Sequence, residues 1–278
     1  MKEHFKIIFV VLVYRNYKDL IEFVDSIKDT KSIKILIVNS FFDLESEKQI
    51  RNIAFSLGCD YLNVENRGYG YGNNKGIEYA HSKYDFDFLI VSNPDIIVKE
   101  FDSEVINSNS ISGPTIISNR NTNQNPYRVH YNKYLEKMTY NAYKKNRSLI
   151  LLFIAIYYKI IRELFIIKTI LLKRNNVEVF ALHGAFIIFP FNILNQINFQ
   201  PFCNKMFLFN EELYLAILCK RKKIKSEFNN KIKVFHKEDG SISLSKIKVN
   251  EESKKSYIIY YEKCILKKSN NNGGLYEH

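Results

Sequence analysis

The chain has 278 residues, of which 46% are hydrophobic and 25% are charged, an ordinary globular composition. This composition excludes a disordered chain and a protein with several membrane spans. The formal net charge is +12, and the first 100 residues are close to neutral, so the basic excess lies in the later residues. A basic second half indicates an anionic partner, such as a phospholipid surface, a lipid diphosphate or a nucleic acid, or else a solvated face.

The four cysteines are far apart in the sequence and form no Cys-x-x-Cys pair. We interpret them as reduced thiols, which indicates a cytoplasmic protein. The apolar residues 7–13 resemble the start of a signal peptide, but Arg15 ends the run and no small-residue cleavage site follows. We therefore expect these residues to form a buried first strand.

Buried-type strands alternate with amphipathic helices through the first hundred residues. The expected strands are 7–13, 33–38, 61–64 and 86–91, and the expected helices are 19–27, 44–57 and 75–81. This alternation predicts an α/β fold with a doubly wound, mostly parallel sheet flanked by helices. Ligands bind such sheets beyond the carboxyl ends of the strands, where Tyr14, Asn39 and Asp95 fall.

The second half is less regular. Residues 119–147 are polar and predict a loop-rich insertion, whereas residues 149–172 are strongly apolar and predict an amphipathic helix pair. Charged residues interrupt this segment before it reaches the roughly 20 consecutive apolar residues that a membrane span needs. Two placements are open: a membrane interface, with the basic side that contains Lys159 and Arg162 toward anionic headgroups, or packing over the sheet.

Shorter patterns complete the chain. They predict a strand at 180–189, a helix at 212–219, a strand at 232–235 and a disordered tail after Asn270. We divide the chain into a domain of residues 1–245 and a C-terminal helix and tail, 246–278. The domain has a nucleotide-sugar half, 1–100, and an acceptor half, 101–245, with a helical insertion at 127–175.

Two polar motifs suggest chemistry. Asn93, Pro94 and Asp95 follow a predicted strand, and a carboxylate there suits Mn²⁺ or Mg²⁺, which bind one or two carboxylates together with phosphate oxygens and water. The tripeptide alone can equally be a turn. The glycine-rich residues 68–76 resemble a phosphate-binding loop in composition, but they match neither G-x-G-x-x-G nor the Walker pattern, which disfavours a dinucleotide or ATP site.

The order of these motifs resembles the family 2 glycosyltransferases of the GT-A fold, particularly bacterial rhamnosyltransferase-like members. The resemblance covers most of the chain, through residues 13–16, 66–76, 93–95, 183–186, 207–212, His236 and 240–241. It implies transfer of a sugar from a nucleotide-diphosphate sugar to a glycan or lipid-linked glycan, as in bacterial surface polysaccharide synthesis. The implied donor is dTDP-rhamnose or a UDP-sugar, and the implied chemistry inverts the anomeric carbon.

The resemblance also assigns roles to single residues. It makes Asp95 the ligand of Mn²⁺ or Mg²⁺, with His236 as a second metal or diphosphate contact, and places Asn93 near the ribose or phosphate. The remaining residues that it places at the nucleotide sugar are Tyr14, Asn39, Arg67, Gly68, Asn74, His183 and Gly184. Asn39 stands where the family often has an aspartate, which favours thymine over uracil, and His183 can equally be a structural histidine.

The general base that the resemblance implies is Glu212, with Glu211 as the alternative. Two glutamates that open a helix also interact favourably with its dipole, so a structural role is open. Two other functions remain: a catalytically silent nucleotide-sugar-binding homologue, and a basic nucleic-acid-binding protein, although no recognition pattern for nucleic acid is present. The sequence predicts a cytoplasmic protein, either free or at the inner face of the cell membrane. A homodimer is a further possibility.

Overall fold

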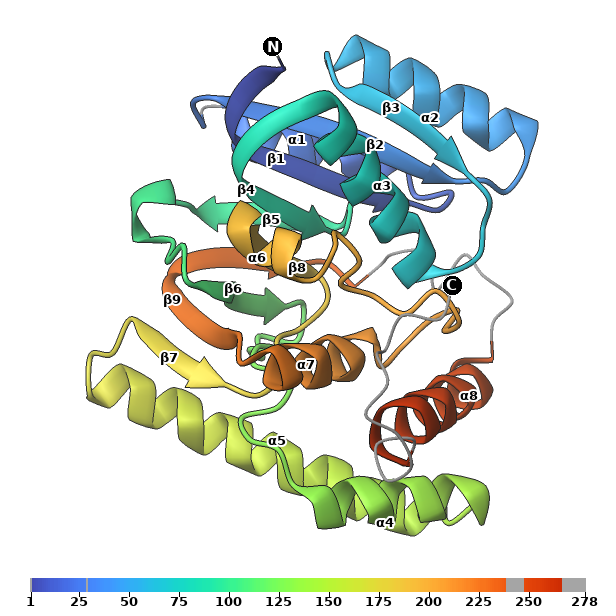
Figure 1. Cartoon of the computed structure of the whole chain (residues 1–278), viewed down its shortest axis with the longest axis vertical. Helices are drawn as coiled ribbons and strands as arrows, with labels where there is room; N and C mark the ends of the chain where they lie inside the picture. The colour runs from blue at the N-terminus through green and yellow to red at the C-terminus, as the bar shows by residue number, and fades with distance from the viewer. Residues whose placement is uncertain (1, 29, 239–247, 267–278) are drawn as a thin grey trace.

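A computed structural model describes residues 2–28, 30–238 and 248–266 (Figure 1). Its N-terminal half alternates strands and helices as the sequence predicts. The elements are β1 (Glu3–Val13), α1 (Lys18–Ile27), β2 (Ile33–Ser40), α2 (Leu44–Ser56), β3 (Asp60–Val64), α3 (Tyr69–Lys83), β4 (Tyr84–Ser92) and β5 (Ile96–Glu100).

The later residues add the other half of the sheet and most of the peripheral helices. In chain order these elements are η1 (Ser103–Val105), β6 (Ser110–Ser118), α4 (Lys133–Lys144), α5 (Ser148–Leu171), β7 (Asn176–Val179), β8 (Phe186–Pro190), α6 (Phe191–Gln196), α7 (Glu211–Lys222), β9 (Lys225–His236), α8 (Val249–Tyr261) and η2 (Glu262–Leu266).

The described strands form one mixed sheet in the order β3-β2-β1-β4-β8-β6-β9-β5, with β7 paired to β9. The strands β1, β2, β3, β4, β6 and β9 run in one direction, and β5, β7 and β8 run in the other. The sheet is therefore mostly parallel, as predicted. One edge collects the carboxyl ends of the first set and the beginnings of β5 and β8.

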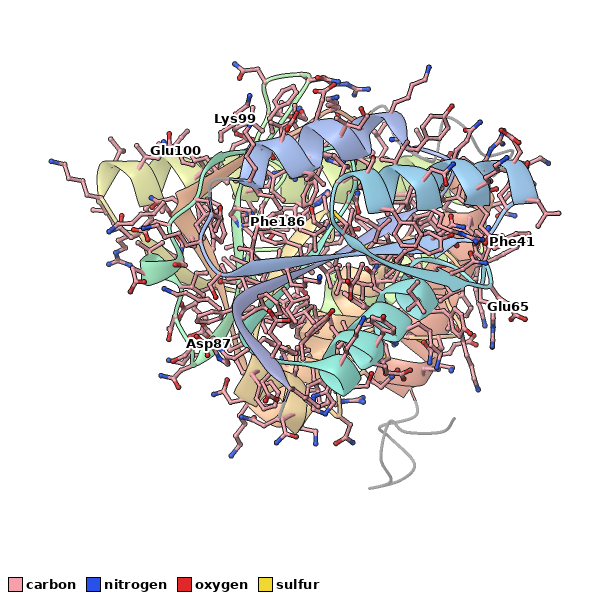
Figure 2. All side chains as sticks on the ribbon, turned by 90° about the horizontal axis from the view of Figure 1, so that it is seen from above. Phe41, Glu65, Asp87, Lys99, Glu100 and Phe186 are labelled. Carbon is pink, nitrogen blue, oxygen red and sulfur yellow. The ribbon has the colours of Figure 1, made fainter. Side chains whose placement is uncertain are left out.

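Helices cover both faces of this sheet. Figure 2 shows α1 and α2 on one side of the sheet and α3 on the other. Alternate residues of β1 point to opposite faces, so Phe9 packs in the core beneath α1 and α2, whereas Val10 packs in the core beneath α3 and α6. This double cover explains why the central strands are continuous apolar runs.

The glycine-rich segment is helical from Tyr69 onward and not a loop, which corrects the sequence prediction. Helix α3 begins at Tyr69, and its glycines allow close packing. A Cβ at Gly76 would lie 2.5 Å from Val10 Cγ1 and 2.7 Å from Val38 Cγ2, and a Cβ at Gly70 would lie 2.7 Å from the Cys203 carbonyl oxygen. The glycines let α3 approach β1 and β2.

The polar segment 119–147, predicted to be loop-rich, contains the helix α4. The Asn132 side chain caps this helix by accepting hydrogen bonds from the N–H groups of Tyr134 and Leu135. Its buried face holds Glu136, Thr139, Tyr140 and Ala142, so it lacks the aliphatic periodicity by which sequence reasoning finds helices. The ring of Tyr140 stacks on Tyr261 of α8 with 4.3 Å between the centroids.

Residues 149–172 form one helix, α5, and not a helix pair. The side that carries Arg162 and Thr169 faces inward: Thr169 is 3% exposed, and Arg162 donates to the Gln124 carbonyl over 3.4 Å. No helix among the described residues has the length and apolarity to cross a bilayer.

Other boundaries differ from those predicted. Strand β8 begins at Phe186 and not at residue 180, β9 is longer than residues 232–235, and β5, β6 and β7 were not predicted. Strand β6 escaped detection because it contains Gly113 and Pro114, next to a register shift against β9. The predicted disordered tail and residues 240–241 lie outside the described residues.

The contact between α3 and β1 can be tested by Gly76→Ala. We expect this variant to lower the free energy of unfolding by about 1–3 kcal/mol, because an added methyl group meets valine methyl groups in a packed core. Denaturant unfolding measures the change. The double variant with Val10→Ala removes one clashing methyl group, so its loss should be smaller than the sum of the two single losses. Additive losses would contradict the packing described.

Candidate active site

A cavity of about 630 Å³ opens at the edge of the sheet where the parallel strands end. It is bounded by residues at or just after the ends of β1, β2, β4 and β9 and by residues that precede β5, β8 and α7. The lining residues are Leu12, Tyr14, Ser40, Asn66, Gly68, Tyr69, Asn93, Pro94, Asp95, Gln124, Tyr127, His183, Gly184, Ala185, Phe207, Leu208, Phe209, Asn210, Glu211, Glu212, His236, Glu238 and Ser253.

Asp95 and His236 face each other in this cavity. Antiparallel pairing of Ile96 with His236 sets the register, and the Lys237 N–H donates to the Asp95 carbonyl over 3.0 Å. The Asp95 Oδ1 atom then lies 3.4 Å from His236 Nε2, and the two side chains are 5% and 11% exposed. Two strands therefore place a carboxylate and an imidazole together.

Gln124 orients the His236 ring. Its Oε1 atom lies 2.7 Å from His236 Nδ1, and its Nε2 donates to Glu238 over 2.6 Å. Since an amide oxygen only accepts hydrogen bonds, His236 Nδ1 carries a proton, and Nε2 faces the Asp95 carboxylate. With Nε2 unprotonated, the carboxylate oxygen and this nitrogen would bind one cation between them.

The Asp95 carboxylate and the His236 imidazole fit a Mn²⁺ or Mg²⁺ ion whose other coordination positions are filled by a bound nucleotide and water. Among the described residues there is no group of three or more His, Cys, Asp or Glu side chains placed to hold a metal ion. One carboxylate and one imidazole provide only part of an octahedral shell, and the diphosphate of a bound nucleotide with water would provide the rest.

His183 lies on the segment before β8 and is neutral. Its Nδ1 accepts the Ala185 N–H over 3.2 Å, so the ring proton sits on Nε2. Burial and the nearby His236 and Arg162 lower the pKa of His183 from 6.5 to about 3. The ring can therefore donate a hydrogen bond in the cavity without carrying charge.

Gly184 touches Glu212. Its N–H donates to Glu212 Oε1 over 3.3 Å, and a Cβ at this position would lie 2.8 Å from the same oxygen. The Gly184 carbonyl accepts the Tyr69 hydroxyl over 2.7 Å. The absence of a side chain at Gly184 therefore leaves room for the carboxylate.

Glu211 and Glu212 open α7 and titrate differently. Burial and the neighbouring charge of Glu212 raise the pKa of Glu211 well above its usual range, and one of its oxygens is buried without a hydrogen-bond partner. Burial also raises the pKa of Glu212, but its own N–H, the Gly184 N–H and Arg128 oppose that rise. The pair therefore holds its proton on Glu211, and Glu212 is the carboxylate.

A strained turn presents these two glutamates. Phe209 and Asn210 both have positive φ angles, +72° and +65°, in the left-handed region that costs free energy for a bulky residue. Helix α8 holds the turn, because Ser256 Oγ donates to the Leu208 carbonyl over 2.7 Å and Asn210 Nδ2 donates to the Ser253 carbonyl over 3.2 Å.

The other side of the turn packs on the start of α3. The Tyr69 N–H donates to the Phe207 carbonyl over 2.8 Å. A Cβ at Gly68 would lie 2.2 Å from that oxygen, and the Gly68 φ of +103° also favours glycine. Gly68 is thus required for the turn to approach α3.

The structure brings nine of the residues predicted for the site into the cavity wall. They are Tyr14, Gly68, Asn93, Asp95, His183, Gly184, Glu211, Glu212 and His236. The predicted residues Asn39, Arg67 and Asn74 do not line it.

These three residues make other contacts. Asn39 donates to Asn63 over 2.8 Å, and the Arg67 guanidinium stacks on the Tyr71 ring. Asn74 is 1% exposed and donates to the Phe202 carbonyl and to Asn204, each over 2.8 Å. Asn74 therefore fixes the chain that precedes the strained turn.

Sequence reasoning missed Gln124, Tyr127 and Arg128. They lie in the polar segment after β6, which has no periodicity or motif, so no sequence signal distinguishes them. The Arg128 guanidinium lies 3.5 Å from the centroid of the Tyr158 ring on α5. Its positive charge lowers the pKa of Glu212, against the effect of burial.

Known proteins similar to this chain are found by comparison of structures and not by comparison of sequences. No family model matches the sequence, and no curated protein matches it either. GalNAc-T7, crystallised with UDP, GalNAc and Mn²⁺, is similar with a TM-score of 0.60 at 11% identity, over 92% of this chain and 48% of that one. The chain thus spans about half the length of GalNAc-T7.

Two bacterial structures are similar over nearly the whole chain. For S. aureus TarS 1–349 in complex with UDP-GlcNAc the TM-score is 0.56 at 9% identity, over 97% of this chain and 68% of that one. For glucosyl-3-phosphoglycerate synthase from Mycobacterium tuberculosis, in complex with Mn²⁺, UDP and glucosyl-3-phosphoglycerate, it is 0.51 at 10% identity, over 93% and 80%. This chain has the GT-A fold. The GT-A fold is the one that the sequence resemblance implied.

The neutral state of His183 predicts a pH dependence of stability. Between pH 6.5 and about 3, the unfolded chain binds a proton at this ring that the folded chain does not bind, so the free energy of unfolding falls as the pH falls. His183→Asn keeps a hydrogen-bond acceptor and removes the titrating group. Denaturant unfolding at several pH values should show a smaller acid loss for the variant than for the wild type, and parallel profiles would contradict a neutral His183.

Proposed function

We propose that this chain is a glycosyltransferase that moves a sugar from a nucleotide-diphosphate sugar to a hydroxyl group of a glycan or lipid-linked glycan. The observation that carries the proposal is the convergence of Asp95, His236 and Glu212 on one cavity of a GT-A fold. GT-A neighbours crystallised with UDP or UDP-GlcNAc, two of them with Mn²⁺, support the same reaction class.

The donor binds across the strand ends. Tyr14 and Ser40 line the part of the cavity nearest β1 and β2, where we place the base, and Asn93 adjoins Asp95 at the diphosphate. Asp95 and His236 would hold Mn²⁺ or Mg²⁺, which when bound offsets the negative charge that develops on the departing diphosphate. The sequence resemblance favours dTDP-rhamnose or a UDP-sugar as the donor and a bacterial surface polysaccharide as the product.

The acceptor side contains the proton acceptor. Glu212 is a half-buried carboxylate at the cavity wall, and burial raises its pKa toward the working pH, as suits a general base. The neutral Nε2–H of His183 donates a hydrogen bond to the donor sugar or its phosphate. Glu211 stays protonated beside Glu212. A direct attack by the deprotonated hydroxyl on the anomeric carbon inverts its configuration and needs no covalent intermediate.

Thermal shift with nucleotide sugars tests the donor site. Mn²⁺ together with the correct donor should raise the melting temperature, because binding to the native state adds stability by mass action. Asp95→Asn and His236→Ala should each lose the Mn²⁺-dependent part of this rise. Asp87→Asn serves as the matched control, since Asp87 is exposed and bonds only His4 among the described residues.

Two results would contradict the proposed donor site. One is a donor shift of equal size with and without Mn²⁺. The other is a Mn²⁺-dependent shift that both Asp95→Asn and His236→Ala retain in full. A donor shift without transfer to any glycan acceptor would instead favour a silent sugar-nucleotide-binding protein.

Steady-state kinetics distinguish the two glutamates. Glu212→Gln removes the proton acceptor and should lower kcat by about 10²–10⁴-fold with little change in KM for the donor. Glu211→Gln replaces a group that is already neutral, so the loss in kcat should be much smaller.

The reverse order of losses would assign the base to Glu211. The anomeric configuration of the wild-type product, read by NMR, is the accompanying control on the reaction type. A product of retained configuration would rule out the single displacement.

A further inference from the structure

Helix α5 exposes an apolar stripe in which Glu163 is a charged interruption, with its side chain 44% exposed. Helix geometry of ~100° per residue places one set of apolar side chains on a single side, along a helix of 24 residues or about 36 Å. Leu149 and Phe153 are each 69% exposed and Leu171 is 75% exposed. The stripe residues are Leu149, Leu152, Phe153, Ile156, Ile160, Leu164, Ile167, Ile170 and Leu171.

The inner side of α5 carries polar groups beside the buried Ile154 and beside Phe165, which packs on the core. It carries Arg162, whose guanidinium reaches the Gln124 carbonyl, the buried Thr169, and Tyr158, whose ring stacks under Arg128. A surface helix of a globular protein normally exposes mainly polar side chains and turns its apolar side to the core, whereas α5 is apolar on its exposed side as well. A large exposed apolar surface of this kind marks a binding face.

The surroundings of the stripe are basic. Lys159 and Lys168 are exposed and lie on its two opposite borders. Lys145 and Arg147 are exposed just before α5. At the other end, Lys173 and Arg174 are exposed as well. Lysine stems at the borders of an apolar stripe can follow the apolar surface while their charges reach the headgroups.

Charge decides between two occupants of this face. A second copy of the chain would bring the same lysines and arginines against each other, which costs free energy. An anionic lipid surface meets the same charges with complementary ones, and each basic residue near the surface adds to the attraction. Helix α4 lies beside α5 along one end of the molecule (Figure 1), and it exposes Tyr134 and Met138.

We propose that α5 lies in the plane of an anionic lipid bilayer, with the apolar stripe at the boundary between headgroups and acyl chains. This placement reverses the side that the sequence had suggested for the membrane. The inner face of α5 contacts Gln124, which lines the cavity, and Arg128, whose guanidinium lies over the ring of the cavity residue Tyr127, so docking holds the cavity close to the lipid surface. The consequence that the acceptor is carried by a lipid rests on the proposed function, but the membrane contact does not.

Vesicle co-sedimentation of the full chain tests the docking. The wild type should bind vesicles that contain phosphatidylglycerol and phosphatidylcholine, and bind pure phosphatidylcholine vesicles more weakly. The triple variant Phe153→Ser, Ile156→Ser, Ile160→Ser should lose more than about tenfold in partitioning, because three apolar side chains no longer enter the interface. Lys159→Gln with Lys168→Gln should weaken binding to the anionic vesicles only.

The matched control is the pair Leu44→Ser and Phe55→Ser, which changes exposed apolar residues of α2 and should leave vesicle binding unchanged. Circular dichroism and the donor thermal shift report whether each variant is folded with an intact cavity, so a failure of the docking is distinguishable from a failure of the proposed function. No binding of wild type to either vesicle, or equal binding by the triple variant, would overturn the proposal. A dimer in sedimentation velocity that the triple variant abolishes would assign the face to a second copy instead.

Discussion

The antiparallel pairing of β5 with β9 is the constraint on which the candidate site depends. This pairing places Ile96 opposite His236 and so brings the Asp95 carboxylate to 3.4 Å from the His236 imidazole. The two residues are 141 positions apart in the sequence. The Lys237 side chain then fastens the end of β9 to α1 through Asp19, over 2.8 Å. A change of register in this pair would separate the two side chains, whatever the state of the other strands.

A second constraint acts on the part of the cavity wall that contains Glu211 and Glu212. The turn at Phe209 and Asn210 has an unfavourable backbone conformation, and it is held between Gly68 at the start of α3 and Ser256 on α8. Packing contacts on both sides offset the local strain, and the result is that Glu211 and Glu212 begin α7 inside the cavity wall. Helix α8 lies well after these two glutamates in the sequence, so its contribution is to position them.

The N-terminal half was predictable because its strands are buried on both faces and its helices have one apolar side. The same logic failed at β6, where Pro114 interrupts the pattern, and at α4, whose buried side carries Glu136 and tyrosines. Most of the predicted site residues reached the cavity, since the ends of parallel strands meet at one edge. Gln124 could not be found, because it acts only through its contact with His236.

The central claim is that Asp95 and His236 share one divalent cation with a nucleoside diphosphate. The most direct measurement is a crystal structure of the full chain with Mn²⁺ and UDP or dTDP, with anomalous diffraction recorded at the manganese absorption edge. The account predicts an anomalous peak bonded to the Asp95 carboxylate, to His236 Nε2 and to the diphosphate. A nucleotide bound in the cavity with manganese elsewhere, or with Asp95 turned away from the diphosphate, would contradict it.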